Sequence, residues 1–229
     1  MPSEARAANF PDIARQLIEF ENGNGMDVVL GGGRGKFLPR NVADHAEKTK
    51  FGSRVDGRNL ITEWIEKSGG SFVGNRAQLD AVVAGKTKRL LGLFNHSHMQ
   101  FEHDRVEQSA NEPSLSEMTA KAIEILAQNE NGFFLMVEGG RIDHGHHSGN
   151  AFRALTETIE FSRALETALE KIDLEETLVI VTADHSHTLT LSGYSNAAMT
   201  FWDSCREMEI PTKTFWDRTW TRWVCLTQL

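Results

Sequence analysis

The sequence predicts an α/β fold in which a mainly parallel sheet carries helices on both faces. Continuous apolar runs at residues 27–30, 133–137 and 177–182 have the pattern of strands that are buried on both sides. Amphipathic segments with apolar residues at helical spacing, over 114–128 and 150–171, stand among these runs. Strands of this type that alternate with amphipathic helices are typical of a sheet covered on both faces.

Three further segments complete the expected pattern. Helices are predicted over residues 11–21 and 59–67, where apolar side chains recur at helical spacing, and a strand is predicted over 88–94. Ser114 is expected to cap the helix that follows it, and Glu117, three residues on, completes a capping box.

Composition and charge exclude several classes of protein. The 229 residues are 40% hydrophobic and 24% charged, as in ordinary globular proteins. A net charge of −8 argues against unspecific binding to nucleic acid, which requires basic patches. No run approaches the ~18 apolar residues of a transmembrane helix, and the first residues lack the apolar region of a secretory signal. Since the cysteines are Cys205 and Cys225, residues 1–204 hold no disulfide and no thiolate metal site.

Two polar segments each follow a predicted strand. Residues 138–147 come after the strand at 133–137, and residues 183–187 come after the strand at 177–182. They contain eight side chains that bind divalent metals well: Glu138, Asp143, His144, His146, His147, Asp184, His185 and His187. Ligands of parallel sheets collect at the carboxyl ends of the strands, so both segments are expected there. Imidazole with carboxylate suits zinc, whereas carboxylate alone suits magnesium.

Each polar segment alone has a simpler interpretation. A histidine after a strand is usually hydrogen-bonded or solvated, and Gly139 with Gly140 is common in turns. The two segments together favour a metal site, because five of the nine histidines are concentrated in them.

The two segments, with the strand ends before them, resemble a known family. Val137–His147 (VEGGRIDHGHH) is similar to the alkaline phosphatase motif around its magnesium and first zinc, and Val181–His187 (VTADHSH) is similar to the motif around its second zinc. Supporting similarities occur in LGGGR, LGLF, PSLSEM and ALTET, at residues 30–34, 91–94, 113–118 and 154–158. The resemblance covers roughly residues 11–195 and implies a three-layer alkaline phosphatase-like sandwich, as an incomplete domain over residues 1–196.

The resemblance implies a role for each matching ligand. Asp143 and His147 resemble ligands of a first zinc ion, and Asp184 and His185 resemble ligands of a second. Glu138 resembles a magnesium ligand. The implied cofactors are therefore two Zn²⁺ ions and one Mg²⁺ ion.

Other residues of the two segments are expected near the metals. His144 resembles a position beside the phosphate, and His187 resembles a hydrogen-bond partner of a ligand. His146 is expected to contact no metal. Arg141 could clamp a phosphate, although a structural salt bridge within the loop is the favoured interpretation.

Animal members of the family also hold calcium. Phe94, through its carbonyl, and Glu112 resemble two of the Ca²⁺ ligands. Asn95 stands where the family has a glutamate, which removes one negative charge and puts the calcium site in doubt.

The activity that the resemblance implies is hydrolysis of phosphate monoesters, by transfer of the phosphoryl group to a serine and hydrolysis of the phosphoserine. Two zinc ions about 4 Å apart suit this reaction. Members of the family are usually homodimers and are usually extracellular or anchored at the cell surface. Neither a signal nor a membrane anchor is visible in the sequence.

Several segments of the family are absent from the sequence. No Asp-Ser-Ala nucleophile segment, Gly-Asp-Gly segment or Thr-His-Ala-Gly-Glu segment occurs. We therefore expect no catalytic serine in this chain and little or no activity from it alone. A non-catalytic metal- or phosphate-binding fragment, or a partner of a complete subunit, is the alternative. A related phosphodiesterase or sulfatase is a third interpretation, which the length of the match at Glu138–His147 disfavours.

Residues 197–229 differ in character from the rest of the chain. They hold four of the five tryptophans and both cysteines, and they show no similarity to the family motifs. A shift of one nucleotide converts residues 198–203 into Asn-Asp-Ile-Leu-Gly, which resembles the family's continuation after Gly193 and Tyr194. A changed reading frame is favoured over a genuine divergent tail.

The origin of this tail can be tested on the transcript. Sequencing across codons 195–199 is expected to show one missing or extra nucleotide, because the residues before this point match the family and those after it do not. An unaltered transcript, together with resistance of residues 197–229 to limited proteolysis, would contradict the change of frame.

Overall fold

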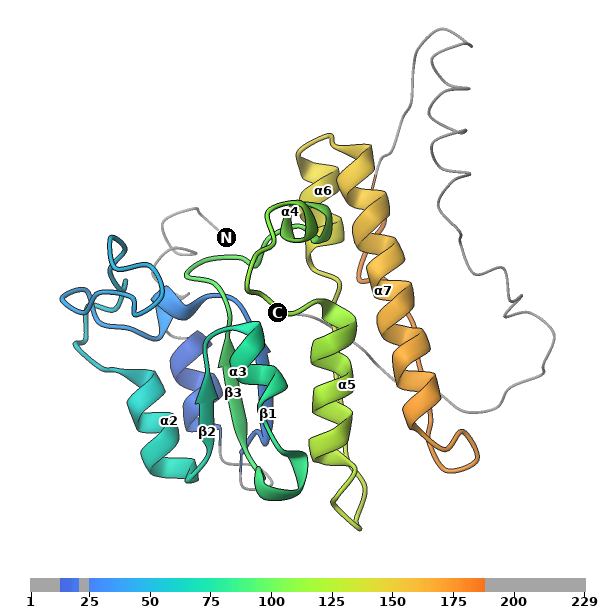
Figure 1. The fold of residues 1–229 in the computed structure, drawn as a ribbon, viewed down its shortest axis with the longest axis horizontal. Helices are drawn as coiled ribbons and strands as arrows, with labels where there is room; N and C mark the ends of the chain where they lie inside the picture. Colours follow the sequence, from blue (N-terminus) through green and yellow to red (C-terminus); the bar gives the residue numbers. More distant parts are fainter. Residues whose placement is uncertain (1–12, 21–24, 188–229) are drawn as a thin grey trace, which may run out of the picture.

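The structure, a computed structural model, describes residues 13–20 and 25–187. Its centre is a three-stranded parallel sheet that consists of β1 (Val28–Gly31), β2 (Ser71–Val73) and β3 (Leu90–Leu93). The strand order is β1-β3-β2, with Leu90 opposite both Val28 and Ser71. The central strand β3 is buried along its whole length, and helices flank the sheet (Figure 1). The predicted parallel sheet is therefore confirmed.

One face of the sheet packs against the first of two hydrophobic cores. Val29, Leu91 and Leu93 point into this core, which a helix over residues 13–19 and α2 (Leu60–Ser68) cover. The two helices contribute Ala14, Ile18, Leu60, Ile61 and Trp64. These helices confirm the ones predicted for this part of the sequence.

The opposite face of the sheet packs against the second core. Val28, Leu30 and Leu90 alternate with the residues of the first core, as the two-residue period of a strand requires. Helices α3 (Arg76–Asp80), α5 (Leu115–Leu126) and α7 (Ala151–Lys171) contribute Leu79, Leu115, Met118, Ile125 and Ala164. Helix α7 runs along the outer side of α5 (Figure 1). The helices on both faces confirm the three-layer architecture.

Helix capping follows the sequence. The Ser114 hydroxyl accepts a hydrogen bond from the Glu117 N–H at 3.2 Å, and the Glu117 carboxylate accepts one from the Ser114 N–H at 2.8 Å. This is the predicted capping box of α5. At the start of α7, the side chain of Asn150 accepts a hydrogen bond from the Arg153 N–H at 3.0 Å.

None of the helices in the described ranges is long and apolar enough to cross a membrane.

Two predicted strands differ from the structure. Residues 133–137 and 177–182 are not strands of the described sheet, and residues 133–137 make no backbone hydrogen bond to another described residue. An apolar run becomes a strand only where a second strand pairs with it, and the sequence pattern does not supply the partner. Val137 is buried in the second core, whereas Phe134 is 76% exposed and Met136 is 44% exposed.

The polar segment after residue 137 is also more regular than predicted. Residues Arg141–His147 form helix α6, where a loop was expected. The glycine and histidine content of this segment conceals the helix in the sequence, since both residue types favour helices weakly. Gly145 is buried against α7, and a Cβ atom there would lie 2.8 Å from the Ala154 nitrogen. Close packing on α7 therefore fixes α6.

A buried ion pair holds the carboxyl ends of β1 and β3 together. Arg34 and Asp44 are 1% and 0% exposed, and the Arg34 Nε donates to both carboxylate oxygens, at 2.8 and 2.9 Å. The Arg34 Nη1 donates to the Leu93 carbonyl at 2.6 Å, and His96 Nδ1 lies 2.8 Å from Asp44 Oδ2. Gly33, with φ of 80°, turns the chain from β1 towards this pair.

The charge of Asp44 depends on these hydrogen bonds. Burial alone raises the pKa of the Asp44 carboxyl, but hydrogen bonds from Arg34, His96 and the Ala46 N–H outweigh burial and lower this pKa from 3.8 to about 2. A lowered folded-state pKa stabilises the fold above pH 3.8, and that contribution is lost as the pH falls towards 2.

Replacement of Asp44 by alanine is expected to lower the free energy of unfolding at pH 7 by about 3–5 kcal/mol, because the Arg34 guanidinium stays buried without its carboxylate. Asp80→Ala is the matched control, since the Asp80 side chain is 63% exposed, and it should change this free energy by less than about 0.5 kcal/mol. Urea unfolding followed by circular dichroism measures both. Equal destabilisation by the two substitutions would show that the buried pair contributes nothing.

Candidate metal centre

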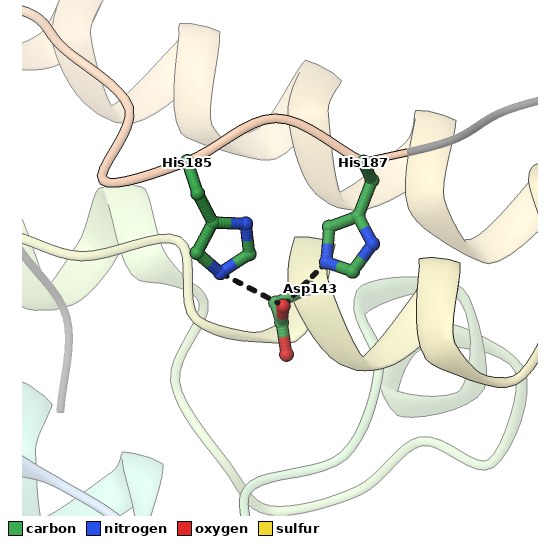
Figure 2. Close-up of side chains that lie close together, drawn as sticks. All are labelled: Asp143, His185 and His187. Carbon is green, nitrogen blue, oxygen red and sulfur yellow. Dashed lines mark hydrogen bonds and ion pairs between the residues drawn. The ribbon is translucent and has the colours of Figure 1, made fainter.

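Three side chains from two distant segments meet beside α6. Asp143 lies on α6, and His185 and His187 lie in the segment that follows residues 177–182 (Figure 2). One ligand atom of each residue lies within 4.8 Å of the others. We call Asp143, His185 and His187 the metal cluster.

The carboxylate of Asp143 is the centre of this cluster. His187 Nε2 lies 2.5 Å from Asp143 Oδ1, and His185 Nε2 lies 3.5 Å from the same oxygen. On the other side, His147 Nε2 lies 3.5 Å from Asp143 Oδ2, because residues four apart share one face of a helix. The hydrogen bond with His187, followed by the charges of the surrounding imidazoles, lowers the pKa of Asp143. The cluster therefore favours an ionised carboxylate.

A further imidazole packs against the cluster without joining it. The ring of His146 stacks on the ring of His187, with centroids 4.9 Å apart and planes 10° apart. His146 Nδ1 lies 2.8 Å from the Ile142 carbonyl oxygen, which orients the ring. The prediction that His146 contacts no metal remains untested, and its position explains how the His187 ring is held in place.

The carboxylate of Glu138 is influenced by two other acidic groups near α6. Burial, followed by repulsion from Asp184 and Asp143, raises the pKa of Glu138. Glu138 is half-buried at the end of residues 133–137, whereas the Asp184 side chain is 82% exposed. A divalent cation would relieve this repulsion, since it would supply positive charge where the described residues place three acidic groups.

The grouping of the ligands differs from the one that the resemblance implies. Asp143 lies closest to His187 and is equally distant, at 3.5 Å, from His147 and His185. Asp184 lies 3.6 Å from His185 but outside the metal cluster. The two-zinc grouping of Asp143 with His147 and of Asp184 with His185 therefore stays a prediction.

Arg141 and His144 lie on the side of α6 that faces the loop after β3. His144 Nδ1 is 3.0 Å from Arg141 Nη1, and its ring is 4.5 Å from the ring of His98. Burial lowers the pKa of both His144 and His98, so burial favours neutral imidazoles. The proximity of His144 to a phosphate remains a prediction.

The salt bridge favoured for Arg141 is wrong for the part of the chain that the structure describes. Its guanidinium lies over the Phe101 ring, 3.7 Å from the centroid, and its Nε is buried without a hydrogen-bond partner. A cation–π contact therefore holds Arg141 in place of a carboxylate.

His98 and Phe101 were not among the predicted site residues. Their position directly after the strand β3 could have identified them, since ligand sites gather at the carboxyl ends of parallel strands.

The residues of the metal cluster fit zinc. Two imidazoles and one carboxylate are the ligand types that Zn²⁺ prefers. Glu138, with Asp143 and Asp184 near it, has the oxygen ligands that suit Mg²⁺. Glu112, by contrast, is buried and accepts hydrogen bonds from Asn95 Nδ2 at 2.6 Å and from the Gln100 N–H at 2.9 Å.

Comparison with known proteins gives consistent matches. The profile of the family described as alkaline phosphatase matches residues 1–217. This match ends inside the tail of residues 197–229, which lies outside the described residues, and the origin of that tail stays a prediction. A membrane-bound alkaline phosphatase of Bombyx mori is 46% identical over 190 residues, which are 81% of this chain and 34% of that protein.

Two vertebrate relatives are similarly close. An alkaline phosphatase of Gadus morhua is 43% identical over 201 residues, which are 85% of this chain and 41% of that protein. The human tissue-nonspecific isozyme is 43% identical over 202 residues, which are 85% of this chain and 38% of that protein. The chain therefore spans about a third to two-fifths of the length of these curated relatives.

Solved structures agree with the fold. The alkaline phosphatase of Thermus thermophilus superposes with a TM-score of 0.57 and 35% identity, over 68% of this chain and 29% of that one. A cold-active alkaline phosphatase of Shewanella sp. gives a TM-score of 0.53 and 28% identity, over 71% and 33% of the two chains.

Loss of one cluster imidazole is expected to weaken zinc binding. His185→Ala should raise the zinc dissociation constant at least about tenfold, because one ligand of the cluster is removed. His103→Ala is the control, since His103 lies on α4 (Glu102–Glu107), outside the cluster. Isothermal titration calorimetry measures both affinities. Equal affinities in the two variants would mean that zinc is bound elsewhere.

Proposed function

Because the chain belongs to the alkaline phosphatase family, we propose that it is the metal-binding part of a phosphomonoester hydrolase. The observation that carries this proposal is the convergence of Asp143, His185 and His187 within 4.8 Å. The repulsion that raises the pKa of Glu138 supports a divalent cation beside this cluster. Phosphate monoesters are the substrates that the family suggests.

The proposed ligands are those of the two polar segments. Asp143, His147, Asp184 and His185 would hold two zinc ions, and Glu138 would hold magnesium. Bound metal ions would supply positive charge to the phosphate oxygens and would lower the pKa of a nucleophilic oxygen. His187 would orient Asp143 through the contact at 2.5 Å, and this orientation would keep the carboxylate ionised.

Arg141 and His144 would face the phosphate from the other side of α6. The Arg141 guanidinium makes no ion pair with another described residue, and its contact with Phe101 fixes its direction. The charges of Glu157, Asp104 and Glu112 act on this guanidinium without forming an ion pair with it, so its N–H donors stay available to an anionic substrate. We therefore assign Arg141 to phosphate positioning, in place of the salt bridge expected from the sequence.

The chain alone should not turn over substrate. Its sequence contains no Asp-Ser-Ala segment, so the serine that accepts the phosphoryl group in this reaction would come from other polypeptide. A second candidate function is that of a non-catalytic metal- or phosphate-binding partner of a complete subunit. The observation that favours it is a formed metal cluster in a sequence without the nucleophile segment.

Assembly and location follow the family in this proposal. A homodimer is the expected assembly, and an extracellular or cell-surface location is the expected one. The Bombyx mori relative is described as membrane-bound. Nucleic acid is not an expected partner, given the net charge of −8.

The activity of the purified chain separates the two candidates from a complete enzyme. With zinc and magnesium present, hydrolysis of a chromogenic aryl phosphate is expected to be no faster than in the same buffer without protein, because the covalent step has no nucleophile. Equilibrium dialysis with radiolabelled inorganic phosphate should still show zinc-dependent binding, reduced at least about tenfold by Arg141→Gln.

Two outcomes would overturn this proposal. Zinc-dependent turnover with phosphate trapped on a serine would mean that the chain carries its own nucleophile. Phosphate binding that is independent of zinc and unchanged by Arg141→Gln would show that neither the metal cluster nor Arg141 takes part in binding phosphate. Lys67→Gln, at an exposed position on α2, is the matched control for loss of a positive charge.

A further inference from the structure

The connection between β3 and α5 is closed by a buried carboxylate. Glu112 is 6% exposed and stands two residues before the N-cap of α5, Ser114. A buried carboxylate is costly unless charged or polar partners satisfy its oxygens. The partners of Glu112 therefore decide whether this connection requires a metal ion.

Both carboxylate oxygens of Glu112 have N–H partners. Asn95 Nδ2 donates to Oε1 at 2.6 Å, and the Gln100 N–H donates to Oε2 at 2.9 Å. We call the bond between Asn95 Nδ2 and Glu112 Oε1 the amide latch. The Asn95 Oδ1 accepts a hydrogen bond from the Ser97 N–H at 2.9 Å. This bond fixes the orientation of the amide, because the oxygen must face Ser97 and the NH₂ group must then face Glu112.

The amide latch joins three parts of the fold. The Asn95 carbonyl accepts the Arg34 N–H at 3.0 Å, and the Phe94 N–H donates to the Gly31 carbonyl at 2.8 Å. Asn95 is thus held by the loop after β1, while its side chain holds the segment before α5. Phe101, which supports Arg141, lies within the connection that the latch closes.

Calcium would meet an unsuitable set of donors here. Ca²⁺ takes about 6–8 oxygen ligands and requires anionic ones for tight binding. The amide of Asn95 presents hydrogen atoms to the carboxylate, and Glu112 supplies the one negative charge of the pair. Arg105 Nη1 lies 3.4 Å from the Glu112 carbonyl oxygen, and the charge of Glu112 acts on Arg141, so positive charge is already nearby.

One observation favours a bound cation, but it does not by itself make a calcium site. Gln100 Oε1 is buried and has no hydrogen-bond partner among the described residues. A single neutral oxygen neither replaces the missing carboxylate nor displaces the two N–H donors from Glu112. Because of this unpaired Gln100 oxygen, the effect of calcium on the protein is the quantity to measure.

From this geometry we infer that Asn95 replaces a metal ion: the amide latch closes the connection between β3 and α5 without calcium. The partial positive charge of the NH₂ group takes the place of the cation against Glu112. This inference is independent of the proposed function, since it concerns neither the metal cluster nor the phosphate.

The test compares melting temperatures of metal-free protein in EGTA and in millimolar calcium. For the wild-type chain and Glu112→Gln, the change caused by calcium is expected to be the same, so that any response comes from other acidic groups. Asn95→Asp places a second carboxylate against Glu112, and its melting temperature in EGTA is expected to be several degrees below that of the wild type. Calcium should restore at least half of this loss.

The double variant Asn95→Asp with Glu112→Gln is the control for the new site. Its response to calcium should fall back to that of the wild type, because one carboxylate of the pair is gone. A calcium-dependent rise in the wild-type melting temperature that Glu112→Gln abolishes would overturn the inference. So would equal stability of the wild type and Asn95→Asp in EGTA. If Asn95→Asp does not fold, equilibrium dialysis with radiolabelled calcium on the wild type and Glu112→Gln decides, with equal binding expected.

Discussion

The carboxyl edge of the sheet depends on the buried pair of Arg34 and Asp44. With 1% and 0% exposure, the two charges interact in a region from which water is excluded, and neither can lose its partner without a large penalty. Arg34 also binds the Leu93 carbonyl at the end of β3, and its own N–H binds the Asn95 carbonyl. The ends of β1 and β3 are therefore fixed relative to each other. This pair therefore also fixes the position of the loop after β3, which contains Asn95, His98 and Phe101.

Two packing contacts of α6 position the metal cluster at that edge of the sheet. Phe101 of the loop after β3 lies under Arg141, and Gly145 lets α6 approach Ala154 of α7 closely. Helix α6 is thus held from both sides, and Asp143 is presented at a fixed position towards the segment that carries His185 and His187. The charges beside the cluster are unbalanced, because Asp184 and Asp143 both repel the carboxylate of Glu138. Structural stability alone would not favour three carboxylates there, whereas a divalent cation would.

Much of the fold follows from local patterns, and the exceptions have physical causes. Strand β3 lies within the strand predicted over residues 88–94, and Ser114 with Glu117 forms the expected capping box. Helix α6 was missed because Gly145 lowers helix propensity locally, and its benefit appears only through tertiary packing on Ala154.

The ligand types of the site were predictable, but their grouping was not. Asp143 and His187 are separated by 44 residues, and the rule that ligands gather at strand ends brings them to one edge without saying which atoms meet. Arg141 shows the same limit: an arginine beside acidic residues suggests a salt bridge, yet Phe101 takes that place through a contact that spacing does not reveal.

The two unpaired segments connect the fold to the proposed reaction. Residues 133–137 lead directly into Glu138 and α6, and residues 177–182 lead directly into Asp184 and His185. Phe134 and Val181 are 76% and 47% exposed, so apolar surface stands open where each segment approaches the site. The curated relatives contain more than twice the length that this chain covers. If the proposed function holds, the nucleophile must come from polypeptide outside this sequence. Strand pairing along these segments would bring that polypeptide to the carboxyl edge, where the metal cluster already lies.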